Sequence, residues 1–362
     1  MHIVQIVTQM EGGGSQRAAI VAAREMRKMD CHVETWFLFK RRPVYENEPD
    51  THSLFPHDPQ SPLDYIVIFA RLAGRLRKTK PDAVLTFTPY ANVLGCFFAL
   101  LAGIKVRVAR QTGLPDENPP IARVLDRLFG SIGVYTSIVF NTTATEIAFS
   151  HYPRRYLRSF STVPNGVSVA KPTLNKSDAR KKLGLPEDQF LFLTVGRLHQ
   201  QKNQSRLFEA LAGIPEVGLI VAGEGKDRDM LDALAASLRI EGRVWLLGER
   251  SPDALGDVYI AADAFIFPSV WESFGIAAME AAGAGLPLAL SDLPALREVT
   301  GGPDSGNALF FDPYDVDAIG DAMRALAFDE ELREALKRRA PGLIEPYSTH
   351  AMATGFLAAM RP

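Results

Sequence analysis

The feature that most constrains this chain is an alternation of short apolar, β-branched runs with longer stretches of helical spacing, and the alternation occurs twice. Six strand-like runs lie between residues 3 and 163, and five more lie between residues 190 and 290, with helix-like stretches between them. Such βαβα order is typical of a parallel sheet with helices on both faces. The sequence therefore predicts an α/β protein with two Rossmann-like, doubly wound parallel sheets in tandem.

The boundary between the halves is expected in the segment 164–182, PNGVSVAKPTLNKSDARKK, which is rich in Pro, Asn and Lys and has no apolar periodicity. These properties indicate an interdomain linker. We expect one domain over 1–164 and a second over 165–344, with a terminal helix at about 345–362 that can pack on either. Open parallel sheets bind ligands at the carboxyl ends of their strands, so the active site is expected in a cleft where the sheets face each other.

Composition narrows the class of protein. Hydrophobic residues make up 47% of the chain and charged residues 23%, which excludes a disordered chain. The longest nearly apolar stretch, 93–104, is about twelve residues, whereas a membrane-spanning helix needs about 20. Met1 leads directly into a strand-like run, so no secretory leader is expected. Cys31 and Cys96 predict neither a disulfide framework nor a cysteine zinc site, and the cytoplasm fits best.

Charge is distributed unevenly along the chain. Residues 1–164 hold 20 Lys and Arg against 14 Asp and Glu, a net charge of +6, whereas residues 165–362 hold 20 against 28, a net charge of −8. One basic run contains Arg154, Arg155 and Arg158. A basic half can attract an anionic lipid surface or a phosphorylated substrate. The alternative is that each basic run is only a solvated face.

Glycine-rich turns follow the first strand of each half. Gly12, Gly13 and Gly14 precede a helix, and such a turn favours a phosphate or diphosphate at the free amides of the helix start. The dinucleotide pattern G-x-G-x-x-G fails here because Arg17 stands at its third glycine. A glycine turn without a ligand is the alternative.

In the second half, Arg197 and Lys202 follow a strand and are five residues apart across a turn, so both cations can converge on one anion. Surface charge is the alternative interpretation. A second glycine turn, Gly223 to Gly225, follows the next strand.

The strongest motif pairs two glutamates. Glu272 lies in a loop, and Glu280 lies about two turns into a helix whose other residues are mostly Ala, Met and Gly. A carboxylate on such an apolar face is either a costly buried charge or a ligand for hydroxyl groups. Between the two glutamates, the amides of Phe274, Gly275 and Ile276 form a helix start that suits a phosphate. The alternative is a surface glutamate beside a capped helix.

Taken in order, these motifs resemble the retaining glycosyltransferases of glycosyltransferase family 4, which have the GT-B fold. The matching segments are Gly13-Gly14, V-P-N-G-V at 163–167, G-R-L-x3-K-N at 196–203, G-E-G at 223–225 and E-S-F-G-x4-E at 272–280. The resemblance spans nearly the whole chain. It implies transfer of a sugar, with retention, from a nucleotide-diphosphate sugar, a UDP-sugar being favoured, to a hydroxyl acceptor.

The resemblance also implies roles for single residues. Arg197 and Lys202 would neutralise the diphosphate leaving group, Glu272 would hold the donor sugar as the third catalytic residue, and Glu280 would accept hydrogen bonds from the ribose hydroxyls. The implied donor-binding set is Gly13, Gly14, Arg197, Lys202, Gly223, Gly225, Gly248, Glu249, Arg250, Glu272, Ser273, Phe274, Gly275, Ile276 and Glu280.

The first half departs from the family at Arg110-Gln111-Thr112, where many members carry a histidine that contacts the donor sugar. The expected acceptor side comprises Tyr90, Asn92, Arg110, Gln111 and Thr112. The acceptor is expected to be a glycan, lipid-linked as in bacterial cell-surface polysaccharide assembly, with peripheral contact at the inner face of an anionic membrane. No nucleic acid is expected as a partner.

We expect neither a metal ion nor a cofactor, because two cations stand where the diphosphate would leave and no DxD motif follows a strand. The sugar would pass through an oxocarbenium-like state, with the acceptor entering on the face that the diphosphate leaves. The alternatives are a nucleotide-sugar epimerase on the same fold, a glycogen-phosphorylase-like enzyme, and a non-catalytic nucleotide-sugar-binding protein. A phosphorylase would need a pyridoxal phosphate lysine, and no lysine is singled out for that role.

Overall fold

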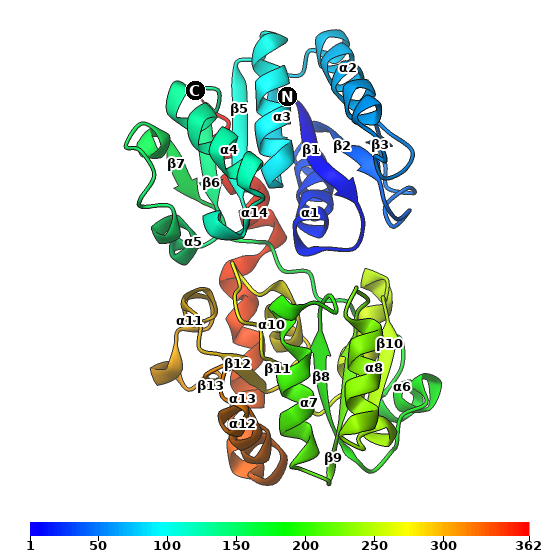
Figure 1. The fold of residues 1–362 in the computed structure, drawn as a ribbon. Helices are drawn as coiled ribbons and strands as arrows, with labels where there is room; N and C mark the ends of the chain where they lie inside the picture. The colour runs from blue at the N-terminus through cyan, green and yellow to red at the C-terminus, as the bar shows by residue number, and fades with distance from the viewer. Residues whose placement is uncertain (362) are drawn as a thin grey trace. The chain divides into compact units, whose positions relative to one another are not determined.

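The computed structural model describes residues 1–361 and divides into two compact units. The first unit contains Met1–Gly166 and the residues from Tyr347 onward, and the second contains Val167–Pro346. Figure 1 shows the elements of both units. The predicted fold class is confirmed, because each unit is a parallel sheet covered by helices on both faces.

The first unit has a seven-stranded sheet in the order β3-β2-β1-β4-β5-β6-β7, with parallel pairing throughout. The strands are β1 (His2–Met10), β2 (His32–Lys40), β3 (Thr51–Ser53), β4 (Ala83–Thr86), β5 (Val106–Gln111), β6 (Ser137–Phe140) and β7 (Phe160–Thr162). The central strands are almost continuously apolar, as expected of strands that are buried on both faces.

Helices cover both faces of this sheet. On one face pack α2 (Pro62–Thr79), α3 (Pro89–Leu101) and α4 (Pro120–Ile132), and on the other pack α1 (Gly14–Lys28) and α14 (Thr349–Ala359). Helix α5 (Thr143–Ala148) follows β6. Although α14 is the last helix of the chain, it lies beside α1 in the first unit, where Phe356 and Met352 enter the core (Figure 1).

The second unit has a six-stranded parallel sheet in the order β10-β9-β8-β11-β12-β13. The strands are β8 (Phe190–Val195), β9 (Val217–Ala222), β10 (Val244–Gly248), β11 (Ala264–Phe267), β12 (Leu288–Ser291) and β13 (Leu309–Phe311). The helices are α6 (Lys176–Leu183), α7 (Gln204–Ala212), α8 (Arg228–Ser237), α9 (Leu255–Ala261), α10 (Ile276–Gly283), α11 (Pro294–Thr300), α12 (Val316–Phe328) and α13 (Glu330–Arg339).

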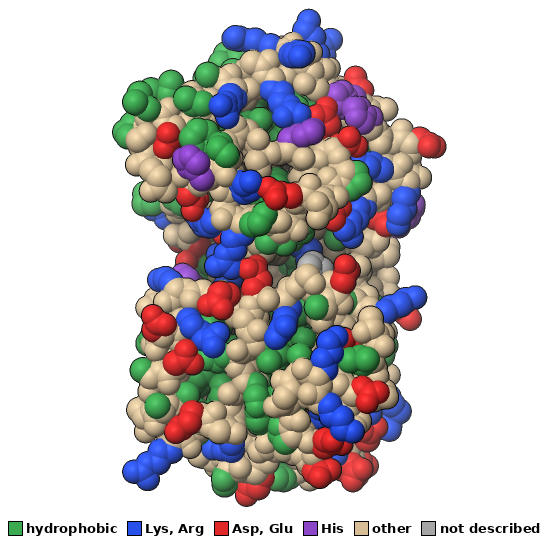
Figure 2. Space-filling view, turned by 90° about the vertical axis from the view of Figure 1, so that its right-hand side faces the viewer, with side chains coloured by type: hydrophobic (Ala, Val, Ile, Leu, Met, Phe, Trp, Pro, Cys, Tyr) green, Lys and Arg blue, Asp and Glu red, His purple; other side chains and the backbone are tan. Residues whose placement is uncertain are grey.

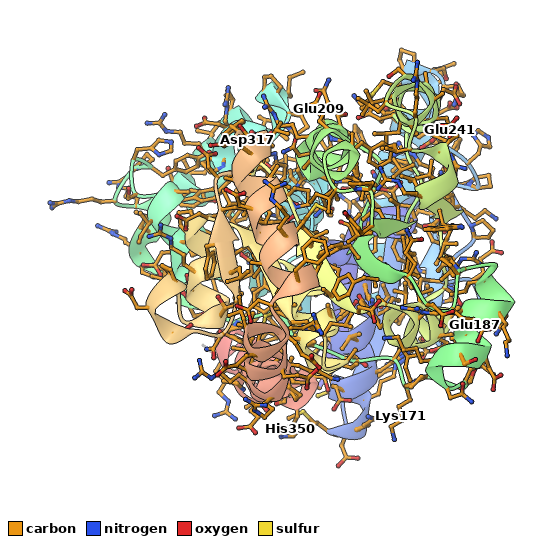
Figure 3. The ribbon with its side chains drawn as sticks, turned by 90° about the horizontal axis from the view of Figure 1, so that it is seen from below. Lys171, Glu187, Glu209, Glu241, Asp317 and His350 are labelled. Carbon is orange, nitrogen blue, oxygen red and sulfur yellow. The ribbon has the colours of Figure 1, made fainter. Side chains whose placement is uncertain are left out.

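Two separate apolar clusters lie on the two faces of the second sheet. The cluster on one face draws on α7, α8, α12 and α13, and the cluster on the other draws on α6, α9 and α10. Figure 3 shows α7 and α12 side by side, with the exposed Glu209 and Asp317 on their outer surfaces.

The structure corrects the sequence-based assignment at several places. Residues 176–182 were expected to belong to a linker, but they lie in α6, which follows the cap Asn175 and buries Ala179 and Arg180 against the unit. The three-residue strands β3 and β13 and the helices α11 and α13 were also missed. Short edge strands carry little periodicity, and α13 is so strongly charged that its apolar side is narrow. Within residues 1–361, no helix has both the length and the apolar character needed to cross a membrane.

Candidate functional site

Topology alone selects the candidate site in each unit. In the first sheet the chain order reverses between β1 and β4, and in the second it reverses between β8 and β11. Ligands of open parallel sheets bind outside the carboxyl ends of the strands at such a switch point. The loops that follow these four strands are therefore the candidate ligand-binding loops.

An ion pair occupies the switch point of the second unit. Lys202 lies in the short turn after β8, Glu272 lies in the loop after β11, and the Lys202 Nζ pairs with the Glu272 Oε1. The two side chains are only 16% and 9% exposed, and the Lys202 Nζ also lies 4.5 Å from the ring centroid of Phe267. Because water is largely excluded here, a bound anion would feel the lysine charge strongly.

Hydrogen bonds from side-chain amides to backbone carbonyls hold the two loops in place. Asn203 adopts a left-handed conformation, and its Nδ2 donates to the carbonyls of Pro268 (3.1 Å) and Pro313 (2.7 Å). The Gln201 Nε2 donates to the carbonyl of Trp271 over 3.1 Å. The position of the ion pair is thus fixed by loops that are tied to one another. Sequence reasoning quoted Asn203 as part of a motif but did not assign it this role.

The predicted diphosphate ligand Arg197 is exposed on the same loop as Lys202. Its carbonyl accepts a hydrogen bond of 3.0 Å from the Gln204 Nε2, which fixes the backbone and leaves the guanidinium at the surface. Arg197 and Lys202 therefore follow the same strand, one exposed and the other mostly buried.

The glycines of the G-E-G motif have a structural explanation. A Cβ at Gly223, whose φ is +154°, would lie 1.8 Å from the carbonyl oxygen of Gly196, and a Cβ at Gly225 would lie 2.2 Å from that of Leu198. The backbone of the loop after β9 thus lies directly against the loop that carries Arg197. These two glycines are required for close packing of the loops, whatever ligand they contact.

The helix α10 begins where the motif predicts. Gly275 precedes it with a φ of +82°, and a Cβ there would lie 2.5 Å from the Leu296 Cδ2. Glu280, in the second turn, is 2% exposed, and the hydroxyl of Tyr259 donates to its Oε2 over 3.0 Å. Glu280 is therefore buried in this structure, and one of its oxygens is bound by a tyrosine of α9 that no sequence motif pointed to. Its role as a ligand for hydroxyl groups stays a prediction.

The remaining predicted donor residues lie at the same edge of the second sheet. Gly248 ends β10 with a φ of +73°, and Glu249 and Arg250 after it are exposed. In the loop after β11, Ser273 is partly buried and Phe274 is fully buried. The partly buried Ile276 is the first residue of α10.

Hydroxyl groups occupy the switch point of the first unit. The Thr8 Oγ1 near the end of β1 lies 2.6 Å from the Thr88 Oγ1 after β4, which also accepts a hydrogen bond from the Thr8 amide. In the adjacent glycine turn, Gly13 precedes α1, and the Ser15 Oγ donates to the Thr112 Oγ1 over 3.0 Å. Sequence reasoning missed Thr8 and Thr88 because single threonines at strand ends carry no motif.

Three of the five predicted acceptor-side residues lie in the core of the first unit. Asn92, Arg110 and Gln111 are 0 to 2% exposed, whereas Tyr90 is 40% exposed and Thr112 is partly buried. Asn92, Arg110 and Gln111 make their contacts within the core of the first unit here, and their assignment to the acceptor side stays a prediction.

Arg110 is enclosed by aromatic rings. Its guanidinium carbon lies 5.2 Å from the ring centroid of Phe87 and 5.0 Å from that of Phe356 in α14, and its Nη2 donates to the Asn165 Oδ1. No carboxylate faces it among the described contacts, and burial lowers its pKa to about 9. The Arg110 side chain thus links β5 to α14 through Phe356 and to the segment after β7 through Asn165.

Gln111 belongs to a buried polar cluster on the opposite face of the sheet. Its Nε2 donates to the Asp126 Oδ1 over 2.8 Å, and the Tyr135 and Tyr156 hydroxyls donate to the same carboxyl over 3.0 and 2.7 Å. Burial raises the pKa of Asp126 to about 6, and the three hydrogen bonds oppose that rise. The Asn92 Nδ2 donates to the carbonyl of Arg110 over 3.0 Å, which ties α3 to β5.

Comparison with known families and proteins agrees with this geometry. Residues 175–342, most of the second unit, match the family described as Glycosyl transferases group 1. A UDP-Gal:alpha-D-GlcNAc-diphosphoundecaprenol alpha-1,3-galactosyltransferase of Escherichia coli is 30% identical over 234 residues, which are 60% of this chain and 59% of that protein. A D-inositol 3-phosphate glycosyltransferase of Rhodococcus jostii is 31% identical over 224 residues, 57% of this chain and 49% of that one. The chain spans about half the length of the curated relatives it matches.

Solved structures match over nearly the full chain. HepE of Anabaena, in complex with UDP-glucose, superposes with a TM-score of 0.84 at 18% identity and covers 99% of both chains. Sucrose-phosphate synthase from Thermosynechococcus elongatus gives a TM-score of 0.82 at 19% identity, over 99% of this chain and 97% of that one. Likeness at this identity establishes the fold. The chain therefore has the GT-B fold, and most of its second unit is similar to the group 1 glycosyltransferases.

Proposed function

We propose that this protein is a retaining glycosyltransferase that moves a sugar from a nucleotide-diphosphate sugar to a hydroxyl of a lipid-linked glycan. The observation that carries the proposal is the Lys202–Glu272 ion pair, which lies at the topological switch point of the unit that is similar to the group 1 glycosyltransferases. A mostly buried cation at a parallel-sheet switch point suits an anionic ligand.

Each donor contact then has a distinct task. Lys202 and the exposed Arg197 neutralise the diphosphate as it leaves, and Glu272 holds Lys202 in position until the donor arrives. The amides at the start of α10 bind phosphate oxygens. Glu280, oriented by Tyr259, accepts hydrogen bonds from ribose hydroxyls. A UDP-sugar is the favoured donor, and the UDP-glucose complex of HepE supports this choice.

The reaction is proposed to proceed on one face of the sugar. The bond between the anomeric carbon and the diphosphate oxygen breaks, the acceptor oxygen forms its bond on the same face, and the leaving diphosphate oxygen takes the acceptor's proton. The paired carboxylates of a retaining glycosidase attack the anomeric carbon itself. Here Glu272 is engaged by Lys202, so a route without a protein nucleophile is favoured. Arg197 and Lys202 supply the positive charge, and activity is proposed not to require a metal ion.

Donor use is tested by incubating the protein with a panel of nucleotide sugars and measuring both released nucleotide diphosphate and the sugar product. A transferase slowly hydrolyses its donor, an epimerase changes the sugar, and a binding protein does neither. Glu280→Gln keeps the side-chain volume and is expected to lower kcat/KM at least about a hundredfold. Full activity in Glu280→Gln would exclude the donor site described above.

Retention and metal independence need separate measurements. NMR of the product with an α-linked donor should show an α-linkage, and an inverted product would contradict the same-face reaction. Activity should persist after exhaustive treatment with EDTA. Loss of activity in EDTA that manganese restores would contradict the metal-free route.

The lipid-linked acceptor is proposed from the surface of α4 in the first unit. Its side chains Ile121, Val124, Leu128 and Ile132 are 70%, 65%, 49% and 63% exposed. At 100° per residue they form one stripe along the helix, which is the pattern of a helix lying in a membrane interface. The name of the Escherichia coli relative, which includes a diphosphoundecaprenol acceptor, supports a lipid-linked substrate.

A basic hollow continues this stripe. Ile132 also borders a surface hollow of about 450 Å³ that is lined by Arg155, Arg158, Tyr135 and Tyr156. The exposed arginines offer charge to anionic headgroups, each contributing about 1 kcal/mol when it is well placed. The apolar stripe and the hollow together would hold the first unit at the membrane surface.

Membrane contact is tested by sedimentation with vesicles of graded anionic lipid content. Binding should rise with anionic lipid, fall with salt, and weaken in Leu128→Ser and in the double variant Arg155→Glu/Arg158→Glu. Lys337→Glu and Arg338→Glu on α13 are the matched charge controls. If the protein does not bind such vesicles and glycosylates a soluble acceptor efficiently, the lipid-linked acceptor is excluded and the basic runs are only solvated surface.

A further inference from the structure

A group of histidines lies at the edge of the first sheet opposite the candidate site. His2 begins β1 and His32 begins β2, and these two residues are partners in the parallel register. Glu34 and Trp36 follow His32 at intervals of two along β2, so their side chains share one face of the sheet. His52 of β3 is the register partner of Trp36. The strand pairing thus places three imidazoles and a carboxylate on three neighbouring strands, with His2 and His32 at the amino ends of β1 and β2.

The distances among these groups are short. The His2 Nε2 lies 3.0 Å from the Glu34 Oε1, and the rings of His2 and His32 lie 4.4 Å apart. One ligand atom from each of His2, His32 and Glu34 falls within 4.8 Å of the others. On the face drawn in Figure 2, histidine side chains lie beside acidic ones on the first unit.

The carboxylate is oriented by its other contacts. The Glu34 Oε2 accepts hydrogen bonds from the Trp36 Nε1 (2.9 Å) and the Arg75 Nη2 (3.4 Å). The opposite oxygen, Oε1, is therefore turned toward His2. A carboxylate whose orientation is fixed by hydrogen-bond donors outside the site is typical of metal sites, because it needs no reorientation when the metal binds.

We propose that His2, His32 and Glu34 form a binding site for a transition-metal ion of the zinc class. Two imidazole nitrogens and one carboxylate oxygen form a ligand set that zinc commonly takes, with water in the fourth position. The His2 Nε2 would exchange its contact with Glu34 for the metal. The His52 Nε2, which lies 3.8 Å from the Glu34 Oε2, is a further candidate ligand.

The positive charge of Arg75 limits the affinity. It lies 3.4 Å from the Glu34 Oε2 and repels a divalent cation, so we expect a dissociation constant on the order of micromolar. The site would join the amino ends of β1 and β2. It is separated from the glycine turn by the nine residues of β1, a span of roughly 26 Å, so it would not take part in sugar transfer.

The test is zinc binding by protein that carries no histidine tag. Competition with a chromophoric zinc chelator should show one site per chain, and zinc should raise the melting temperature of the protein. His32→Ala, at an exposed position, and Glu34→Gln, which keeps its shape, should each weaken binding at least about tenfold. His57→Ala, another exposed histidine of the same unit, is the control and should bind as the unaltered protein does.

Two results would overturn the proposal: absence of zinc binding at 100 μM metal, a concentration about a hundredfold above the expected dissociation constant, or unchanged binding in both His32→Ala and Glu34→Gln. Circular dichroism of each variant shows whether a loss of binding reflects unfolding. Because Glu34→Gln retains the size and part of the hydrogen bonding of Glu34, it decides the question if His32→Ala does not fold. Transferase activity should be the same with and without zinc, so failure of this site leaves the proposed function untouched.

Discussion

The two units use the same topological position for different chemistry. At the switch point of the second unit a lysine and a glutamate pair, whereas at that of the first unit the hydroxyls of Thr8 and Thr88 lie 2.6 Å apart. A charged site suits a diphosphate, whose negative charge grows as it leaves. A site of neutral hydroxyls suits a sugar, because hydroxyls can both donate and accept hydrogen bonds. For the function proposed above, this difference favours a donor in the second unit and an acceptor in the first.

The largest effect is expected from Gly223→Ala, which breaks the loop packing of the second unit. A Cβ would lie 1.8 Å from the Gly196 carbonyl at a φ of +154°, so the backbone must move. We expect a loss of about 3 kcal/mol or more in unfolding free energy and almost no activity. Thermal unfolding and donor hydrolysis measure both quantities.

The matched control is Gly242→Ala, since a Cβ there has no atom within 4 Å. It should leave both the melting temperature and the activity nearly unchanged. If Gly223→Ala is as stable and active as this control, the loops are not packed as described.

Lys202→Ala is expected to have the next largest effect. It removes the mostly buried cation at the second switch point and leaves Glu272 without its partner. We predict a fall of at least about a hundredfold in kcat/KM, roughly 2.7 kcal/mol. Steady-state kinetics with varied donor check this value. Lys181→Ala, at an exposed lysine on α6, is the control and should retain full activity.

A double variant sharpens this result. If Lys202 and Glu272 act as a unit, Lys202→Ala/Glu272→Gln should be hardly worse than Lys202→Ala alone, because one substitution already breaks the pair. Additive losses would show that the two residues act independently on the donor.

The sequence predicted residue positions best where a motif occupies the turn that follows a strand. The positions of Lys202, Glu272 and the start of α10 followed from such turns, and the structure brings the first two into contact. It was least informative in the first unit. Arg110 lies at the end of a strand, where ligands bind, but strand alternation turns its side chain under α14, between Phe87 and Phe356.

That arrangement could not be derived from local pattern, because α14 is about 240 residues further along the chain. Sequence reasoning left open which domain the terminal helix joins. Because α14 covers Arg110, the position of this helix decides whether Arg110 is exposed. Tyr259 was missed for the same reason, since its contact with Glu280 joins two helices that no motif links. The register of β1 with β2, which brings His2 next to His32, likewise depends on the tertiary structure and not on a local pattern.

The contrast between two buried carboxyl groups yields a pH prediction. Glu272 pairs with a lysine, whereas Asp126 in the first unit is held by Gln111, Tyr135 and Tyr156, all neutral. Burial raises the pKa of Asp126 to about 6 from its usual 3.8. The folded protein therefore binds more protons than the unfolded chain between about pH 4 and pH 6. Its unfolding free energy should fall by about 1 to 3 kcal/mol as the pH rises through this window.

The measurement is the difference in melting temperature between the unaltered protein and Asp126→Asn from pH 4 to pH 7. The difference should change up to about pH 6 and then level off, because asparagine does not titrate. Asp188→Asn, at an exposed aspartate, is the control substitution. A constant difference for Asp126→Asn across the whole range would mean that Asp126 is ionised when folded.

The smallest effect is expected from Thr88→Val, which tests the first unit's side of the comparison. The substitution keeps the shape of the side chain and removes the hydroxyl that bonds to the Thr8 hydroxyl and amide. A lost neutral hydrogen bond costs about 0.5 to 1.5 kcal/mol, which corresponds to about a two- to tenfold change. We expect this change in the KM for the acceptor, with donor hydrolysis in the absence of acceptor unaltered, because the donor is proposed to bind at the charged loops of the other unit. Kinetics with each substrate varied in turn separate the two, and Thr51→Val at the far end of the same sheet is the control. A loss confined to donor hydrolysis would show that the hydroxyl site serves the donor. The proposed assignment of the donor to the second switch point and the acceptor to the first would then be wrong.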